Sequence, residues 1–309
     1  MSEPTDSNGA AIPRLPDKDA FAGGIFALGA FGIWGFLPVY FKYMADVPAL
    51  EILAHRIVWS VIFVGLLLLA AGRWGEIRAA LRNRKLVAKL FLTALLISGN
   101  WLLFIWAVTH EHMLQGSLGY YINPLINVVM GVVLLGERLS KAKWIAVALT
   151  ALAVLNLTLG VGEAPWIALT LAMLFGLYGF IRKTTVIAAQ PGLFIETIVL
   201  MIPAVGYLVY LAWVGEGALG ARSLGFDAML MLAGVLTAVP LIFFAAAARR
   251  LRLATLGFFQ FLTPTMQFLL AVFVYGEVFT DSHKITFGLI WLALAVYSAD
   301  SWHRRGKAS

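Results

Sequence analysis

The 309-residue sequence contains no cysteine. A disulfide, an iron–sulfur centre and a thiolate-ligated metal site are therefore excluded. Charged residues are also scarce, because Asp, Glu, Lys and Arg make up only 13% of the chain, about half of the roughly 25% found in soluble domains. Hydrophobic residues make up 61% and the mean hydropathy is +0.88. This balance predicts an integral protein of the lipid bilayer.

Several chemical motifs are missing as well. There is no Gly-x-x-x-x-Gly-Lys-Ser/Thr loop, so ATP is not expected as a direct energy source. There is no Gly-x-Ser-x-Gly elbow and no dinucleotide fingerprint, so we expect neither an enzyme nor a cofactor. The stretch His110-Glu111-His112 lacks the His-Glu-x-x-His spacing and a third ligand, so no metal site is predicted. The net charge of +7 does not indicate nucleic-acid binding, because the basic residues lie in short gaps between apolar runs.

Apolar runs of about 20 residues, the length needed to cross the hydrocarbon core, occur ten times. The predicted spans cover residues 21–43, 51–71, 87–109, 115–135, 143–160, 165–181, 193–214, 227–247, 253–276 and 285–302. Residues 1–20 are polar and proline-containing, and we expect them to form a disordered cytoplasmic tail. The first apolar run is longer than the roughly 7–15 residues of a signal-peptide core, so it is predicted to be retained as a helix.

The basic residues test this ten-span topology. With the N-terminus inside, 19 of the 23 Lys and Arg residues fall in the tail or in cytoplasmic connections. Only Arg222 and Lys284 fall in outside loops, while Lys42 and Arg56 lie at or within helices. This asymmetry is typical of the positive-inside rule. It predicts an all-α integral membrane protein with ten transmembrane helices and with both termini in the cytoplasm.

The sequence also contains an internal repeat. Short matches recur in the same order at nearly constant offset: residues 31–36 with 175–180, Glu51 with Glu196, and residues 119–137 with 257–277. The halves are predicted at 21–160 and 164–303, with five spans each. Because five is odd, the second copy must enter the membrane in the opposite sense. Inverted repeats of this kind are typical of secondary transporters.

Five longer motifs carry a family resemblance. They are the stretches at residues 51–56 (EILAHR), 99–108 (GNWLLFIWAV), 119–125 (GYYINPL), 134–138 (LLGER) and 250–260 (RLRLATLGFFQ). Together they resemble the RarD group of the EamA family, in the drug/metabolite transporter superfamily, over roughly residues 21–303. The resemblance implies a multi-pass protein of the bacterial inner (plasma) membrane with two EamA domains and a central cavity between them. Better-understood relatives export amino acids and other metabolites, so the solute itself is not identified.

Polar side chains inside a span are expensive, so each one is a candidate for function. Glu51 and His55 are four residues apart and can pair on one helix face. Arg56 lies deeper and can offer a planar fork to a carboxylate. These residues are candidates for substrate binding or proton coupling, and an interfacial ion cluster is the structural alternative. Glu196 lacks the His-Arg that follows Glu51, so a structural role is expected for it.

Amides and aromatic residues complete the predicted substrate site. The candidates are Trp34, Asn100, Trp101, Asn123, Asn127, Tyr178, Gln260 and Gln267, together with His55 and Arg56. Spans 115–135 and 253–276 each carry amides beside a proline, and paired irregular helices are a pointer to a transport site. Helix–helix hydrogen bonding is the alternative for the amides, and packing or gating for the aromatic residues.

The sequence therefore predicts a secondary transporter. We expect an exporter of a small metabolite or an amphipathic drug-like solute that works by alternating access. Its partners are the lipid bilayer and the solute. Coupling to a proton gradient, coupling to a solute gradient and facilitated diffusion are the three alternatives for the energy source. The sequence does not indicate an oligomeric state, and no nucleic-acid partner is expected. A membrane scaffold or sensor, a channel and a lipid-acting membrane enzyme are the alternatives.

Overall fold

The computed structural model describes residues 17–136, 139–183, 185–251 and 253–305. All regular structure in these ranges is helical. The elements are α1 (Asp17–Tyr43), α2 (Ala49–Ala70), α3 (Trp74–Arg82), α4 (Arg84–Thr109), α5 (Met113–Leu135), α6 (Lys141–Val161), α7 (Trp166–Lys183), α8 (Ala189–Val214), α9 (Leu224–Ala248), α10 (Leu253–Phe259), α11 (Leu262–Leu269), the π-helix η1 (Leu270–Val274) and α12 (Asp281–Arg305). Of the predicted tail, residues 1–16 lie outside the described ranges and residues 17–20 are helical.

Eight stretches within the described residues are long and apolar enough to cross a membrane. They are Asp19–Tyr43, Ala49–Ala70, Arg84–Thr109, Met113–Leu134, Lys141–Val161, Ala189–Val214, Leu224–Ala248 and Thr255–Val274. Trp166–Arg182 is a shorter apolar helix. Helix α12 covers the last predicted span but is not among the eight. The chain is thus an all-helical polytopic membrane protein.

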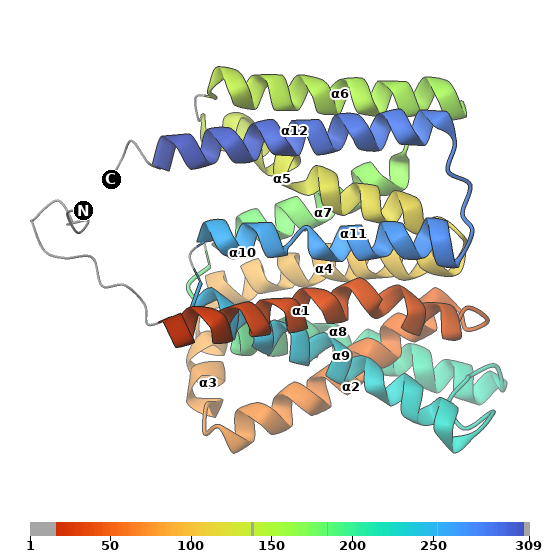
Figure 1. The fold of residues 1–309 in the computed structure, drawn as a ribbon. Coiled ribbons are helices and arrows are strands. Elements are labelled where there is room, and N and C mark those ends of the chain that lie inside the picture. Colours follow the sequence, from red (N-terminus) through yellow and green to blue (C-terminus); the bar gives the residue numbers. More distant parts are fainter. Residues whose placement is uncertain (1–16, 137–138, 184, 252, 306–309) are drawn as a thin grey trace, which may run out of the picture.

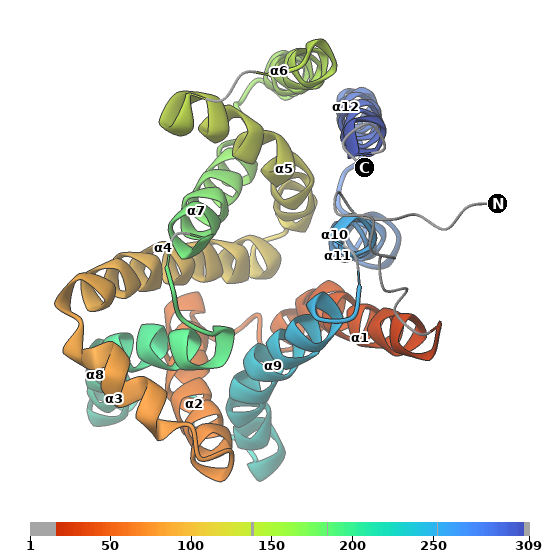
Figure 2. The same ribbon diagram turned by 90° about the vertical axis from the view of Figure 1, so that its left-hand side faces the viewer.

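The helices run side by side with alternating direction (Figure 1). Helices α6 and α12 pack against each other at one side of the bundle, and Figure 2 shows the other helices gathered beneath them. One end of the bundle, on the left of Figure 1, holds α3, the start of α6 and the end of α9. We call it the basic end, because its connections carry most of the arginines, such as Arg73, Arg82 and Arg249.

Local capping residues explain where several helices begin and end. At the start of α4 the Asn83 side chain accepts the backbone N–H of Leu86. At the start of α9 the Ser223 side chain accepts the backbone N–H of Phe226. Each bond satisfies a donor that has no partner within the helix. Gly136 and Gly215 end α5 and α8 in the left-handed conformation, which glycine adopts without a steric penalty.

Prolines interrupt these helices less than the sequence predicts. Helix α5 continues through Pro124, and α9 continues through Pro240. The irregular segment is the predicted span 253–276, where the chain breaks between α10 and α11 at Gln260-Phe261 and then forms the π-helix η1. Irregularity of this kind inside a membrane segment is tolerated where neighbouring protein satisfies the freed backbone groups.

Close helix contacts depend on glycine. A Cβ added to Gly234 of α9 would collide with the Trp59 backbone of α2, and one added to Gly119 of α5 would meet the Ala168 carbonyl oxygen of α7 at 2.8 Å. Small residues at such crossings allow the two backbones to approach. These contacts fix α9 on α2 and α5 on α7, and so they determine which polar side chains face each other in the interior.

Candidate functional site

Arg56 occupies the centre of the polar interior. It is the eighth residue of α2, and its side chain is only 5% exposed. Its Nε donates to Thr237 Oγ1 of α9 at 2.8 Å, and its guanidinium carbon lies 4.0 Å from the centroid of the Trp101 ring on α4. No carboxylate among the described residues forms an ion pair with it. A charge at this depth therefore relies on one hydroxyl and one aromatic face.

A second polar network adjoins this arginine. Asn100, which is buried, donates from Nδ2 to the Leu171 carbonyl oxygen of α7 at 3.1 Å. Tyr120 of α5 donates a long hydrogen bond of 3.4 Å to Asn100 Oδ1, and Tyr120 lies within electrostatic range of Arg56. We call Arg56, Trp101, Thr237, Asn100 and Tyr120 the Arg56 site. Its residues lie on α2, α4, α5 and α9, and the bond from Asn100 to Leu171 ties it to α7 as well.

Glu51 and His55 lie on α2 between Arg56 and the end of the bundle opposite the basic end. Glu51 Oε1 accepts the Ala218 backbone N–H at 2.6 Å, and His55 Nε2 is 3.8 Å from the same oxygen, too far for a hydrogen bond. Both side chains are at most 2% exposed. Glu51 Oε2 and both ring nitrogens of His55 have no hydrogen-bond partner. The predicted pairing is therefore present in space but leaves three buried polar atoms unsatisfied.

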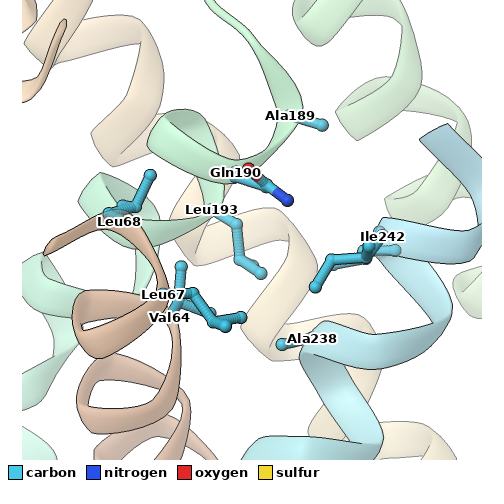
Figure 3. Close-up of a pocket in the computed structure, with 9 residues that line it drawn as sticks. Val64, Leu67, Leu68, Ala189, Gln190, Leu193, Ala238 and Ile242 are labelled. Atoms are coloured by element: carbon cyan, nitrogen blue, oxygen red, sulfur yellow. The ribbon is translucent and has the colours of Figure 1, made fainter. Parts of the chain in front are cut away.

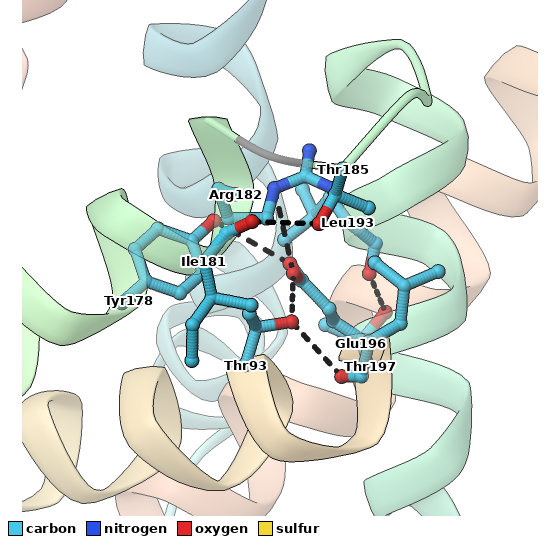
Figure 4. Close-up of polar contacts among 9 residues, drawn as sticks. Thr93, Tyr178, Ile181, Arg182, Thr185, Leu193, Glu196 and Thr197 are labelled. Atoms are coloured by element: carbon cyan, nitrogen blue, oxygen red, sulfur yellow. Dashed lines mark hydrogen bonds and ion pairs between the residues drawn. The ribbon is translucent and has the colours of Figure 1, made fainter. Parts of the chain in front are cut away.

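Tyr178 lies in a different cluster, which Figure 4 shows together with Thr93, Arg182 and Glu196. Its hydroxyl donates to Glu196 Oε2 at a long 3.5 Å. Glu196 Oε1 accepts the Thr93 hydroxyl at 2.7 Å and lies 3.6 Å from Arg182 Nε. The carboxylate, 1% exposed, thus ties α4 and α7 to α8, as expected of a structural residue. Sequence reasoning treated Arg182 only as a topology signal and missed Thr93.

The remaining predicted amides do not form one constellation. Gln267 is 1% exposed, with its Nε2 at 3.4 Å from the Trp34 carbonyl oxygen and its Oε1 unpartnered. Asn123 is partly buried and its Oδ1 also lacks a partner, whereas Asn127 and Gln260 are exposed. Within the described residues, no hydrogen bond joins any of these amides to another. Trp34 packs against Phe31 and Phe244.

A small pocket lies elsewhere, between α2, α8 and α9 (Figure 3). Its lining is Val64, Leu67, Leu68, Ala189, Gln190, Leu193, Ala238, Leu241 and Ile242. None of the ten predicted site residues lines it, and Gln190 supplies its only polar side chain. Solute sites combine apolar walls with several placed polar groups. The Arg56 site brings together more polar groups than this pocket does. No group of three or more His, Asp or Glu suited to a metal occurs among the described residues.

A bundle of apolar helices with a few buried polar groups defines a polytopic membrane protein. Known proteins place it more narrowly. Residues 21–159 match the EamA-like transporter family. The chain is 45% identical to Protein RarD of Salmonella typhi, over 94% of this chain and 99% of that one. It belongs to the EamA-like transporter family, as the sequence motifs predicted.

Two further relatives agree with this assignment, and one solved structure shares the fold. An uncharacterized transporter of Vibrio cholerae is 46% identical over 92% of this chain and 95% of that one. Protein RarD of Escherichia coli K12 is 44% identical over 94% of this chain and 99% of that one. A crystal structure with 16% identity covers 90% of this chain and 97% of that one at a TM-score of 0.54, which shows a shared fold. The chain is a multi-pass protein of the bacterial inner membrane.

Proposed function

We propose that this protein is a secondary transporter that exports a small metabolite or an amphipathic drug-like solute by alternating access. The observation that carries the proposal is the Arg56 site. In this site the buried Arg56 guanidinium stacks on the Trp101 ring and donates a hydrogen bond to Thr237. Arg56 on α2 and Trp101 on α4 come from residues 21–160, whereas Thr237 on α9 comes from residues 164–303. Substrate sites of inverted-repeat transporters lie at such a junction, near the middle of the membrane.

Helix packing supports the proposed architecture of ten transmembrane helices in two inverted repeats. Helix α2 packs on α8, α5 on α11 and α6 on α12, so three helices of the first half each contact their counterpart in the second. Helix α1 packs on α9 as α7 packs on α4. This exchange of roles is what a two-fold axis in the membrane plane requires. The arginines of the basic end support cytoplasmic termini.

Contacts between the halves support alternating access. At the end opposite the basic end, Glu277 accepts the N–H groups of Met113 and Leu114, each at 2.7 Å. Glu51 accepts the N–H of Ala218 there as well. These bonds tie a residue of one half to the backbone of the other and hold this end shut. Release of the same bonds would allow the opposite conformation.

The proton is the coupling ion that we propose. Glu51 and His55 are both buried, and one oxygen of Glu51 and both ring nitrogens of His55 lack a hydrogen-bond partner. A buried polar group without a partner needs an explanation such as a functional role. A proton shared between them would also weaken the bond from Ala218 to Glu51, and so it would link proton uptake to opening of this end. Glu51→Gln should abolish proton movement driven by a solute gradient in liposomes.

The test of the transporter proposal begins with ligand-dependent melting of the detergent-purified protein, because a ligand of the folded state stabilises it. Amino acids, nucleosides, phosphonates, polyamines and chloramphenicol form the panel. Every compound that raises the melting temperature is then assayed for flux in proteoliposomes and for accumulation in everted vesicles, as an exporter requires. Stabilising compounds that show no flux in either direction would contradict the proposal.

Two tryptophan variants make the flux assay specific. Trp101→Ala removes the ring beneath Arg56, whereas Trp213→Ala removes a ring on α8 that is 83% exposed. A desolvated cation–π contact contributes about 2 kcal/mol, so Trp101→Ala should slow flux by at least about tenfold. Trp213→Ala should leave the rate within about twofold of wild type, because single exposed apolar residues contribute little. Equal rates in both variants would remove Trp101 from the site.

A further inference from the structure

Arg56 is a buried cation without a buried anion. Its side chain is 5% exposed, and the one hydrogen bond of its guanidinium found among the described residues runs from Nε to Thr237. Its two terminal amino groups donate to no described residue. Buried charges are normally paired, and one inside a membrane helix is expensive and therefore points to function.

The neighbouring contacts position the guanidinium but do not neutralise it. The Trp101 ring holds one face at 4.0 Å, and Thr237 fixes Nε. The terminal amino groups therefore keep a restricted orientation. A planar guanidinium fork of this kind matches the two oxygens of a carboxylate.

The charges around Arg56 favour an anion over a zwitterion. Tyr40 and Tyr120 lie near Arg56, and each hydroxyl is already bonded, to Met229 O and to Asn100 Oδ1 respectively. The nearest acidic side chain along α2 is Glu51, five residues away, and Ala218 occupies one of its oxygens. No described acidic side chain pairs with Arg56, so a solute ammonium group placed beside the guanidinium would meet the cation with no carboxylate in contact to offset it.

We propose that Arg56 binds the carboxylate of the transported solute and that the solute carries a net negative charge. This assignment rests on the proposed transport function and names its substrate class. Binding would supply the missing counter-ion, so the site is electrostatically complete only when it is loaded.

The experiment compares two probes of nearly equal shape, phenylacetate and phenylacetamide, by melting of the full-length protein in detergent. Phenylacetate should raise the melting temperature of the wild type and phenylacetamide should not. Arg56→Gln should abolish the difference. Arg56→Lys keeps the charge but loses the fork, so it should raise the dissociation constant of phenylacetate by about tenfold. It also serves as the folded variant if Arg56→Gln does not accumulate.

Arg222→Gln is the matched control. Arg222 also lies over an aromatic ring, 4.3 Å from the centroid of Phe226, but it is paired with Asp46 outside the helices. Its replacement should leave the phenylacetate response unchanged. Equal responses to both probes, no response to either at millimolar concentration, or a carboxylate preference that survives Arg56→Gln would each overturn the assignment.

Flux separates this proposal from the transport function itself. Proteoliposomes that move a neutral or cationic solute while Arg56→Gln leaves the rate unchanged would overturn the carboxylate assignment and leave the transporter standing. Arg56-dependent phenylacetate binding without flux of any panel compound would overturn the transport function and leave Arg56 as a carboxylate-binding residue.

Discussion

The packing of α9 on α2 makes Gly234→Ala a sensitive test of the structure. A Cβ at position 234 would collide with the Trp59 carbonyl group and lie 2.8 Å from Ser60 N. All of these are backbone atoms of α2, held by its own helical hydrogen bonds, so they cannot move aside as the end of a flexible side chain could. The two helices would have to separate locally.

The expected size of the effect follows from one favourable and two unfavourable terms. Replacing glycine by alanine in a helix interior is favourable by about 1 kcal/mol, whereas overpacking a tight contact costs about 1–3 kcal/mol. Thr237 lies one turn from Gly234, and its 2.8 Å bond to Arg56 would lengthen. A hydrogen bond to a charged group is worth about 1.5–3 kcal/mol. The variant should therefore be destabilised by roughly 2–4 kcal/mol in all.

Gly206→Ala is the control, because Gly206 lies on an exposed part of α8 and an added Cβ would meet nothing within 4 Å. It should gain the helix term of about 1 kcal/mol alone. Both variants are purified in detergent, and their thermal unfolding is monitored by circular dichroism at about 222 nm, the usual helix wavelength. The two unfolding curves give the difference in stability. Equal stability of the two would refute the close contact between α2 and α9.

Two further predictions concern ion pairs that differ in burial, since the Glu196–Arg182 pair lies mostly inside the bundle and the Asp46–Arg222 pair is exposed. Glu196→Gln should destabilise the protein by at most about 3–5 kcal/mol, because it leaves the partly buried Arg182 without its charged partner, and a double variant with Arg182→Gln should recover part of the loss in the same melting assay. Asp46→Asn should cost less than about 1 kcal/mol, because its pair with Arg222 is exposed. The hydrogen bond from Arg222 holds the pKa of Asp46 below its usual range. The pair therefore contributes stability above the unfolded pKa of about 3.9, and melting at neutral and at acidic pH should show that contribution lost as the pH falls through the folded pKa.

Apolar length predicts most of the helices because each must satisfy its backbone inside a hydrocarbon layer. The predicted span 51–71 matches α2 (Ala49–Ala70), and 227–247 matches α9 (Leu224–Ala248). The short helix α3 (Trp74–Arg82) escaped prediction because nine residues in a charged connection produce no long apolar run. The break at Gln260-Phe261 was not located either, because proline marks a strained region without fixing which peptide leaves the helix.

The interior of the site was harder to predict than the helices that carry it. Arg56 and Trp101 stand out in the sequence as polar or aromatic residues within spans, but nothing in the sequence indicates that one stacks on the other. That contact depends on the rotation of α2 and α4 about their axes, and the backbone contact at Gly234 involves α2 alone. Thr237 was missed for the same reason, because a single threonine in an apolar helix gives no signal until its neighbour across the interface is known.

The two glutamates at corresponding positions of the predicted repeat have acquired different surroundings. Glu196 has Thr93 and Arg182 on one oxygen and Tyr178 near the other, whereas Glu51 has one backbone N–H and an unsatisfied oxygen. The donors from α4 and α7 make Glu196 a tie between helices. Glu51 instead keeps one buried oxygen without a donor, and a carboxylate oxygen in that state can still accept a hydrogen bond.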